Sequence, residues 1–425
     1  MPAVSGSGGE AGRGERREVL FLQGPPGSFF HDLARGLRAR GHGVHRVNFN
    51  GGDRLDWRGG AVDYRGGPGG WPGFLARLLI ARGVTDVVLF GDCRPIHRTA
   101  RAVAGGMGLA IHVFEEGYIR PDWVTLERGG VNGFSALPAD PQWYLQAVRH
   151  LDPCPVRPAL PSAIGRRGRA GVAYYLAAFL AAPAYPGYRT HRPWLSVLEA
   201  LGWTRRALVR RLAGRRDPVP GRSYFLLPLQ LDSDYQLRTH SDFEGMQPAL
   251  AQVIVSFARH APPDAQLAVK RHPLDNGLCD WRRRTLDFAR ALGVEGRVLF
   301  LEGGDIDALV GGARGVVTVN STTGALALAA GVSVATLGRA VYDIPGLTHQ
   351  GSLDAFWRTT ERPDVRLYEA FRRVLAARCL LWGGFYASET RTLLVESAAD
   401  RILGGVHVAA AGADLPVEPC MMAAE

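Results

Sequence analysis

Apolar and polar positions along the chain alternate in two similar blocks, residues 19–160 and 223–355. In the first block, short runs rich in Val, Leu, Ile and Phe predict strands at 19–23, 44–50, 86–90 and 111–114, and mixed segments predict helices at 29–40 and 74–81. Strands that alternate with helices along the chain are typical of a parallel sheet covered by helices. We therefore expect a Rossmann-like lobe at residues 19–160.

The second block repeats this alternation. Apolar runs predict strands at 224–231, 266–270, 297–301, 316–319 and 332–337, and the segments 246–261, 305–311 and 325–330 predict helices. Two further helices, near 363–382 and 389–403 within the region 356–404, are expected to brace the lobes. The predicted fold class is α/β, with two Rossmann-like lobes that face a central cleft. Residues 1–18 are expected to be a disordered start, and residues 405–425 a loose tail.

Composition narrows the class of protein. The 425-residue chain is too long for one ordinary core, and its apolar content of 46% is typical of a globular protein. Its five cysteines are scattered and form no CxxC pair, which argues against a disulfide framework or a zinc site. The first 18 residues are mostly Gly, Ser and charge and do not resemble an export signal. No apolar run reaches the roughly 18 residues that a spanning helix needs. We expect a cytoplasmic protein.

The region between the blocks, residues 161–222, is expected to be a connector with unusual composition. An apolar stretch at 172–188 lies between basic runs at 165–171 and 205–216. One interpretation is a core helix followed by a solvated, arginine-rich face. The other is a segment that rests on anionic lipid headgroups, because interfacial helices combine these two features. Nucleic acid is a weaker alternative for a chain of net charge +10, since no nucleic-acid-binding motif accompanies the charge.

Polar residues follow the first predicted strand of the second block. Gln230 lies near the end of an apolar run and Asp232 and Asp234 follow it, at the strand end where open α/β sheets bind ligands. A single Asp in this position more often caps the next helix or turn, and that interpretation stays open for each carboxylate. The segment 232–234 also spells DxD, which in other proteins holds a metal ion and a diphosphate.

The next strand ends of this block carry features that suit an anion. Lys270, Arg271 and His272 follow one strand, and Pro273 keeps residue 272 extended. Between another strand and its helix lies the sequence NSTTG, which consists of Asn320, Ser321, Thr322, Thr323 and Gly324. Such a loop presents backbone N–H groups and the positive end of the helix dipole. The alternative for His272 is a strand-end histidine bonded to a carbonyl.

The first block carries polar residues after each of its strands. These residues are Gln23, Gly24 and Gly27, then Asn50 and Asp53, then Asp92 and Arg94, and finally Glu115, Glu116 and Arg120. The first loop lacks GxGxxG, and Pro25 and Pro26 remove two backbone donors, which argues against dinucleotide binding. Successive strand residues point to opposite faces, so we expect at most one of the two glutamates to face the cleft. Either could instead form a scaffold ion pair with Arg94 or Arg120.

These motifs together resemble a known family. QGPPGSFF, FNGGD, EEGYIRP, TLE, GVNG, QLDSD, His-Pro and NSTTG occur in this order between about Val19 and Trp357. They are similar to motifs of the bacterial capsule-synthesis glycosyltransferases of the KpsS/KpsC type, which are retaining β-Kdo transferases that use CMP-activated 3-deoxy-D-manno-octulosonic acid. The resemblance implies a GT-B-like architecture in which the first lobe binds the acceptor and the second binds the CMP-sugar.

The resemblance also implies roles for the residues. Asp234 is expected to be the nucleophile and Glu116 to activate the acceptor hydroxyl, with Asp232 and Glu115 as the alternatives for each role. The donor is expected at Gln230, Lys270, Arg271, His272, Pro273 and Asn320 to Gly324, and the acceptor or cleft at Gln23, Gly24, Gly27, Asn50, Asp53, Asp92, Arg94 and Arg120. No cofactor or metal is expected, because a CMP donor carries a single phosphate.

Partners follow from the same resemblance. A single module resembles the initiating enzyme, so the expected acceptor is phosphatidylglycerol or lyso-phosphatidylglycerol. The protein is then expected to be peripheral at the inner face of the cytoplasmic membrane, near other capsule synthesis and export proteins, and not on nucleic acid. The alternatives are a noncatalytic component that binds glycolipid for assembly or export, and a transferase of another CMP-activated sugar.

Overall fold

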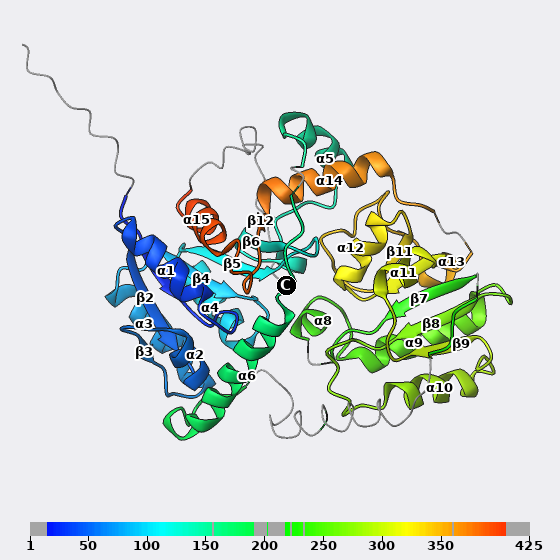
Figure 1. The fold of residues 1–425 in the computed structure, drawn as a ribbon, viewed down its shortest axis with the longest axis horizontal. Helices are drawn as coiled ribbons and strands as arrows, with labels where there is room; N and C mark the ends of the chain where they lie inside the picture. Colours follow the sequence, from blue (N-terminus) through cyan, green and yellow to red (C-terminus); the bar gives the residue numbers. More distant parts are fainter. Residues whose placement is uncertain are drawn as a thin grey trace, which may run out of the picture.

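The computed structural model describes residues 15–154, 157–190, 202, 217–221, 223–232, 234–358 and 361–404. Figure 1 shows two α/β lobes side by side, the N-terminal lobe drawn in blue and cyan and the C-terminal lobe in green and yellow. Each lobe contains its own sheet with helices packed around it. The predicted fold class is therefore confirmed.

The N-terminal lobe is built on a seven-stranded sheet in the order β12-β6-β5-β4-β1-β2-β3. Its strands are β1 (Glu18–Phe21), β2 (Gly43–Asn48), β3 (Val62–Asp63), β4 (Asp86–Phe90), β5 (Ala110–Glu116), β6 (Trp123–Arg128) and β12 (Leu380–Trp382). The first five strands pair in parallel, whereas β6 and β12 pair antiparallel at one edge. The strand order reverses between β1 and β4, which makes the loops after these two strands the switch point of this lobe.

Helices cover both faces of this sheet. They are α1 (Phe29–Ala39), α2 (Gly51–Asp56), α3 (Trp71–Ala81), α4 (Pro95–Gly106), α5 (Pro141–Ala147) and α6 (Ile164–Leu180), with short 3-10 turns at Pro68–Gly70, Asn132–Phe134, Val148–His150 and Ala182–Ala184. Helix α1 buries Phe29, Phe30, Leu33, Ala34 and Leu37, a spacing that places one apolar stripe on the sheet. This packing fixes the loop that leaves β1.

The C-terminal lobe contains a five-stranded parallel sheet in the order β11-β10-β7-β8-β9. Its elements are β7 (Tyr224–Pro228), α8 (Tyr235–Thr239), α9 (Met246–His260), β8 (Gln266–Lys270), α10 (Trp281–Ala291), β9 (Val298–Leu301), α11 (Ile306–Gly311), β10 (Gly315–Thr318), α12 (Thr322–Ala329), β11 (Ser333–Thr336) and α13 (Leu353–Phe356). The strand order reverses between β7 and β10. The loops with Gln230 and Asn320 therefore begin at the switch point.

The C-terminal segments return to the N-terminal lobe. Helix α14 (Val365–Arg378) packs on α5, strand β12 pairs with β6, and α15 (Arg391–Ile402) packs on α1. The helix predicted at 363–382 is thus wrong at its end, because residues 380–382 extend a sheet. Helix α14 also contacts the C-terminal lobe, where Leu367 lies in the same apolar cluster as Ile344 and Leu347. The expectation that these segments brace the lobes is confirmed.

The first part of the predicted connector packs on the N-terminal lobe as helix α6, which lies against α2. Two glycines allow this close approach, because a Cβ at Gly51 would lie 2.2 Å from the Ala177 carbonyl oxygen and one at Gly52 would lie 2.6 Å from the Tyr174 ring. The basic run at 205–216, most of residues 1–18 and the tail 405–425 lie outside the described residues. Within the part that the structure describes, we find no helix both long enough and apolar enough to cross a membrane.

Candidate active site between the two lobes

The switch point of the C-terminal lobe is held by a reciprocal pair of amide side chains. Gln230 donates from Nε2 to Oδ1 of Asn320 over 2.8 Å and accepts at Oε1 from the Asn320 backbone N–H over 3.1 Å. Asn320 in turn donates from Nδ2 to the backbone carbonyl of Gln236 over 3.1 Å. The segment that follows β7 and the loop before α12 are thereby fixed against each other.

The two aspartates of this segment have different surroundings. Asp234 caps α8 by accepting from the Gln236 backbone N–H over 2.9 Å, and burial raises the pKa of its carboxyl against the opposing effects of that N–H and of Arg120. Asp232 accepts from the Met246 backbone N–H over 2.8 Å at the start of α9, and about half of its side chain is exposed. The capping interpretation therefore holds for Asp234, and its carboxylate is the more buried of the pair. Ser233, between them, lies outside the described residues.

A carboxylate from the N-terminal lobe reaches this segment. Glu115, near the end of β5, accepts a hydrogen bond at Oε2 from Nε2 of Gln236 over 3.3 Å. Burial raises the pKa of Glu115 to about 7, and the nearby carboxylates of Glu116 and Asp234 act in the same direction. Glu115 is therefore a carboxyl group that changes protonation near neutral pH, and it lies across the lobe boundary from Asp234.

Glu116 points elsewhere. Its Oε1 forms an ion pair of 3.0 Å with Nη1 of Arg167, on α6, rather than with Arg94 or Arg120. The alternation of side chains along β5 explains the divergence of the two neighbours. The structure thus joins Glu115 to the C-terminal lobe and Glu116 to α6, and the proposed catalytic role of Glu116 stays a prediction.

Gln236 links these groups and was missed by sequence reasoning. Its backbone N–H binds Asp234, its backbone carbonyl binds Asn320, and its side chain binds Glu115. As an uncharged residue in a short helix it carries no chemical signature of its own. The one available signal was its position two residues after Asp234, where a helix presents its first free N–H groups.

The predicted anion-binding loops lie at the same edge of the C-terminal sheet. Ser321 caps α12 by accepting from the Thr323 backbone N–H over 3.2 Å. Gly324 is required there, because a Cβ would lie 2.3 Å from the Tyr342 hydroxyl oxygen. The residues after β8 emerge beside β7, since the Leu229 N–H donates to the Lys270 carbonyl over 2.9 Å. The α12 start and the segment 270–272 therefore flank the Gln230 loop.

Within that second segment the side chains differ in their use. Lys270 is buried, and the imidazole Nδ1 of His272 accepts from the Leu274 backbone N–H over 3.0 Å, in the turn that contains Pro273. Arg271 binds Oε2 of Glu302 over 2.8 Å and lies 3.7 Å from Oδ1 of Asp275. Two carboxylates already hold this guanidinium, which makes Arg271 part of the scaffold around the site.

The polar loops of the N-terminal lobe form a closed network. Asp53 accepts from Nε2 of Gln23 over 3.1 Å, from the Tyr174 hydroxyl over 3.0 Å and from the Phe49 backbone N–H over 2.9 Å, and it pairs with Arg46 over 3.2 Å. Asn50 caps α2 and also donates to the Tyr174 hydroxyl. These side chains are buried, so α6 seals them through Tyr174.

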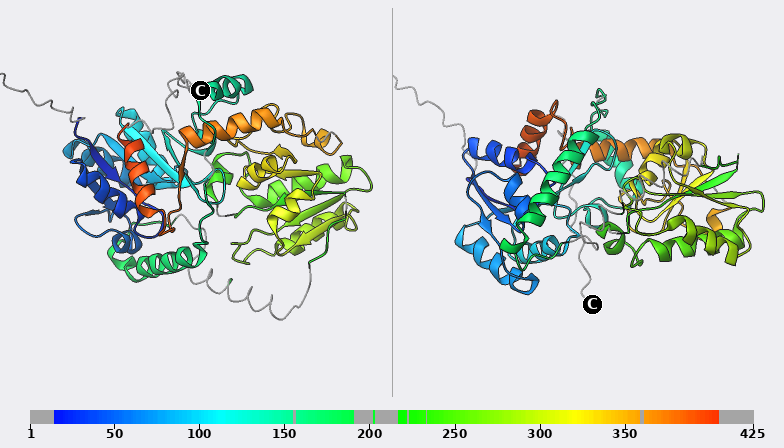
Figure 2. Two further views of the ribbon diagram at one scale, coloured as in Figure 1. Left: turned by 45° about the horizontal axis from the view of Figure 1, so that its top comes forward. Right: turned by 60° about the horizontal axis from the view of Figure 1, so that its bottom comes forward.

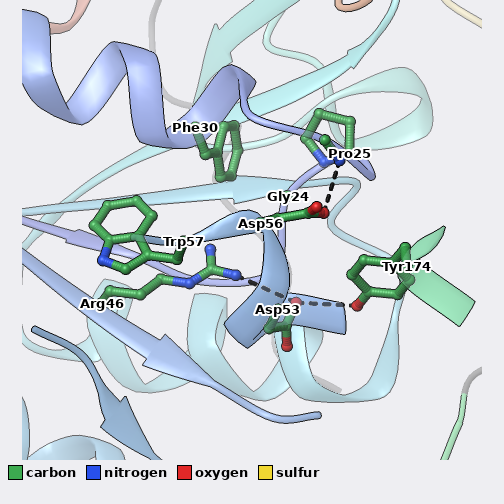
Figure 3. Close-up of a pocket in the computed structure, with 9 residues that line it drawn as sticks. Gly24, Pro25, Phe30, Arg46, Asp53, Asp56, Trp57 and Tyr174 are labelled. Atoms are coloured by element: carbon green, nitrogen blue, oxygen red, sulfur yellow. Dashed lines mark hydrogen bonds and ion pairs between the residues drawn. The ribbon is translucent and has the colours of Figure 1, made fainter. Parts of the chain in front are cut away.

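A small pocket lies beside this network (Figure 3). It is lined by Gly24, Pro25, Gly27, Phe30, Arg46, Asp53, Asp56, Trp57 and Tyr174. Gly27 has a φ of 107°, which favours glycine, and its N–H donates to Oδ2 of Asp56 over 2.7 Å. Burial raises the pKa of Asp56 to about 6. Asp56 was not among the predicted residues, because it is the last residue of α2, four residues after the FNGG sequence.

The loop after β4 contacts the C-terminal lobe. Asp92 accepts from the Val131 N–H over 2.9 Å, and the Cys93 thiol lies 3.3 Å from Oδ1 of Asp92 and 3.3 Å from Nε2 of His240. Among the described residues, these three side chains are the group whose donor atoms could surround a metal ion. Burial raises the pKa of the Cys93 thiol and lowers the pKa of His240 to about 4, so both groups are neutral in the hydrogen-bonded contact that they form here.

The two predicted arginines of the cleft have different surroundings. The guanidinium of Arg94 lies 5.3 Å from the centre of the Phe90 ring, and its charge opposes the rise in the pKa of Glu115. Arg120 is exposed, and its charge acts in the same way on the pKa of Asp234. Both cations therefore lie within electrostatic reach of the carboxylates at the lobe boundary.

The fold and the site define a two-lobed α/β protein in which the loop after β4 and Glu115 of β5 contact the segment that follows β7 in the other lobe. The chain matches the family described as Capsule polysaccharide biosynthesis protein over residues 85–386 and belongs to this family. It is 35% identical over 386 residues to the capsule polysaccharide export protein KpsS of Escherichia coli, covering 87% of this chain and 97% of that protein. The resemblance that the motifs indicated is confirmed.

One further relative and one solved structure are also similar to this chain. The capsule polysaccharide modification protein LipB of Neisseria meningitidis serogroup B is 34% identical over 385 residues, covering 87% of this chain and 91% of that protein. The solved structure of Thermosulfurimonas dismutans KpsC, described as a β Kdo 2,7 transferase, is 16% identical with a TM-score of 0.43, covering 84% of this chain and 89% of that chain.

Proposed function

We propose that this protein is a retaining glycosyltransferase that transfers Kdo from CMP-β-Kdo to phosphatidylglycerol, or to its lyso form, and so starts the Kdo linker of a capsular polysaccharide. The observation that carries the proposal is the pair of carboxylates, Glu115 and Asp234, that face each other across the lobe boundary with Gln236 between them. Membership of the capsule biosynthesis family supports the choice of pathway.

A retaining transfer by double displacement needs a carboxylate nucleophile and a second group that accepts a proton. In our proposal, a carboxylate oxygen of Asp234 attacks the anomeric carbon, and the bond from that carbon to the CMP phosphate oxygen breaks. The acceptor hydroxyl then attacks the same carbon, loses its proton to a base and releases Asp234. Net retention follows from two inversions.

We assign the base to Glu115. A general base works best when its pKa is close to the working pH, and the pKa of Glu115 is about 7. Glu115 also contacts the segment that carries Asp234, whereas Glu116 is paired with Arg167. Glu116 is the alternative base, and substitution of each glutamate in turn separates the two.

The donor is proposed to bind at the edge of the C-terminal sheet. The start of α12 at Ser321 offers backbone N–H groups to the CMP phosphate, and Lys270 and His272 add positive or hydrogen-bonding groups from the adjacent strand end. Asn320 would be oriented by Gln230. One phosphate can be neutralised by these groups, so we propose a reaction without a metal or another cofactor.

The acceptor is proposed to approach from the N-terminal lobe, where the loops after β1 and β2 surround Gln23, Asn50 and Asp53. A lipid acceptor places the protein at the inner face of the cytoplasmic membrane, near other capsule synthesis and export proteins. A second candidate is a noncatalytic component that binds glycolipid. The observation in its favour is that Asp234 caps a helix, a structural role that needs no nucleophilic chemistry.

The test uses purified protein, CMP-Kdo made in situ and short-chain phosphatidylglycerol, with Asp234→Asn as the variant. An asparagine oxygen can still accept from the Gln236 N–H, so the cap and the fold are retained. We expect loss of glycosylated lipid by at least about a thousandfold. Trapped wild-type protein should gain the mass of one Kdo residue. Product from Asp234→Asn at nearly the wild-type rate would remove Asp234 as nucleophile, and donor binding without turnover by the wild type would favour the noncatalytic candidate.

A further inference from the structure

Helix α6 has two faces of opposite character. Tyr174 is buried and binds Gln23, Asn50 and Asp53 through its hydroxyl. On the other side, large apolar side chains are exposed: Val172 by 69%, Leu176 by 55%, Phe179 by 58% and Leu180 by 69%. At about 100° per residue, positions 172, 176 and 179 lie within about 40° of the direction opposite residue 174. Among the described residues, the outer face of α6 is thus an apolar stripe that no other element covers.

The charge on this helix is of one sign. Its 17 residues include Arg166, Arg167 and Arg169 and no acidic residue. Arg166 and Arg167 lie toward the protein, where they pair with Glu389 and Glu116 over 3.1 Å and 3.0 Å. Arg169 is exposed, and helical spacing places it on the same side as Val172 and Leu176. An apolar stripe beside exposed positive charge complements a layer that has an apolar interior and anionic groups at its surface.

The position of α6 links this face to the candidate site. Its buried side contacts the carboxyl ends of three strands of the N-terminal sheet: Arg167 binds Glu116 at the end of β5, Ala170 lies by Gly27 after β1, and Ala177 lies by Gly51 after β2. Figures 1 and 2 show the helix running along the N-terminal lobe with one end toward the C-terminal lobe. The inner side of α6 therefore borders the proposed acceptor region, and its outer side faces away from the lobe.

We propose that the outer face of α6, formed by Arg169, Val172, Leu176, Phe179 and Leu180, docks on a bilayer of anionic phospholipid. A helix of this kind lies in the headgroup plane with its apolar residues in the acyl boundary, and each cation adds attraction to anionic headgroups. Docking would bring the acceptor loops of the N-terminal lobe to the lipid surface. The link from docking to lipid glycosylation rests on the proposed function, whereas bilayer binding itself does not.

The test measures flotation of the full-length protein with vesicles of phosphatidylcholine alone and of phosphatidylcholine with phosphatidylglycerol. The variant is Leu176→Glu with Phe179→Glu, and the matched control is Ile80→Glu, which replaces a 71% exposed apolar residue on α3. We expect the wild type and the control to bind the anionic vesicles, and the double variant to bind at least about tenfold more weakly. Arg169→Ala is expected to weaken binding about fivefold at low salt and less at high salt.

Several results would overturn the proposal. These are no vesicle binding by the wild type, equal binding by the double variant, or equal binding to vesicles with and without phosphatidylglycerol. A dimer in solution that the double variant dissociates, together with no flotation, would assign the stripe to a second copy of this chain.

Transfer to water-soluble short-chain phosphatidylglycerol separates this proposal from the proposed function. If docking fails, soluble-acceptor transfer persists in the wild type. If the enzymatic proposal fails, vesicle binding persists without product. We expect the double variant to keep soluble-acceptor transfer and to lose transfer to lipid in vesicles.

Discussion

Two polar clusters of this molecule, one after strands β1 and β2 and one at the switch point of the C-terminal sheet, end in different chemistry. In the N-terminal lobe, Gln23, Asn50 and Asp53 bind one another and are sealed by Tyr174. In the C-terminal lobe, Gln230 and Asn320 bind each other, but their network continues through Gln236 to Glu115 of the other lobe. The first arrangement is a scaffold, and the second joins the halves.

This difference indicates which polar cluster takes part in the reaction and which one only holds the loops in place. Asp53 is buried, accepts three hydrogen bonds and forms an ion pair with Arg46. Its carboxylate therefore has little freedom to react. Asp234 and Glu115 each accept one hydrogen bond from Gln236, and Glu115 accepts a second from the Glu116 backbone N–H over 3.0 Å. Burial raises the pKa of both carboxyl groups. Perturbed carboxylates that lie close together are typical of functional sites. We therefore infer that the N-terminal network shapes the acceptor loops, and that the lobe boundary carries the reaction.

The largest expected effect separates the two neighbouring glutamates. Glu115→Gln keeps an oxygen that can accept from Gln236 but removes the base, so kcat/KM should fall by about 100- to 10,000-fold. Glu116→Gln loses an ion pair with Arg167 at a half-exposed position and should cost less than about tenfold. Initial rates of lipid glycosylation measure both. The reverse order of effects would return the base to Glu116.

The scaffold assignment of the N-terminal network predicts a loss of stability. Asp53→Ala leaves the buried guanidinium of Arg46 without its carboxylate, which should lower the free energy of unfolding by about 3–5 kcal/mol. Asp232→Ala is the matched change in the other lobe. It removes an exposed carboxylate that accepts one N–H at the start of α9, which should cost about 1 kcal/mol. Urea unfolding compares the two, and equal losses would contradict the contrast.

The pH dependence of the rate should report Glu115. Its pKa of about 7 lies above the ordinary value of 4.5, so the base is increasingly protonated as the pH falls below 7. The rate, kcat/KM, should then drop about tenfold per unit of pH below that value and level off above it. Glu115→Gln should lose this acidic limb at its lower rate. A limb that survives in that variant belongs to another group.

The raised pKa of Glu115 also affects stability, but with the opposite dependence on pH: the rate rises with pH, whereas the contribution to stability falls. A carboxyl whose pKa is higher in the folded than in the unfolded protein binds more protons when folded between the two pKa values. The contribution of Glu115 to stability is therefore present below about pH 4.5 and is lost as the pH rises toward 7. Unfolding of the wild type and Glu115→Gln at pH 5 and pH 7.5 should show a smaller decline in the variant.

The sequence predicted the parts of the fold that local pattern decides. Strands 86–90 and 266–270 agree with β4 and β8, because each is a short apolar run between polar turns. Residues 380–382 were assigned to a helix because the apolar pattern of α14 continues into them. Their strand state depends on pairing with β6, more than 250 residues earlier in the chain, a contact that no local pattern contains.

The sequence predicted where the site lies in the fold, but not which of its residues bind one another. The predicted alternation of strands and helices placed Gln230, Asp234 and Asn320 at one edge of the C-terminal sheet. The resemblance to the family motifs identified them as site residues. The links across the chain were not visible: Gln236 to Glu115 spans 121 residues, and Tyr174 to Gln23 spans 151. Alternation along β5 predicted that its two glutamates diverge, but it did not decide which one faces the other lobe, because the direction is set by the packing of β5 in the sheet.

The smallest predicted effect tests whether the N-terminal network has a structural role rather than a role in the reaction. Tyr174→Phe keeps the ring of α6 against Gly52 and removes the hydroxyl that Gln23, Asn50 and Asp53 share. Loss of these bonds from buried groups should lower the free energy of unfolding by about 1–3 kcal/mol and change transfer to a soluble acceptor by less than about fivefold. Tyr144→Phe, which removes a buried hydroxyl that has no hydrogen-bond partner among the described residues, is the matched control and should lower neither quantity. A large loss of rate at nearly unchanged stability would place the Tyr174 hydroxyl in the reaction and remove the distinction between the two polar clusters.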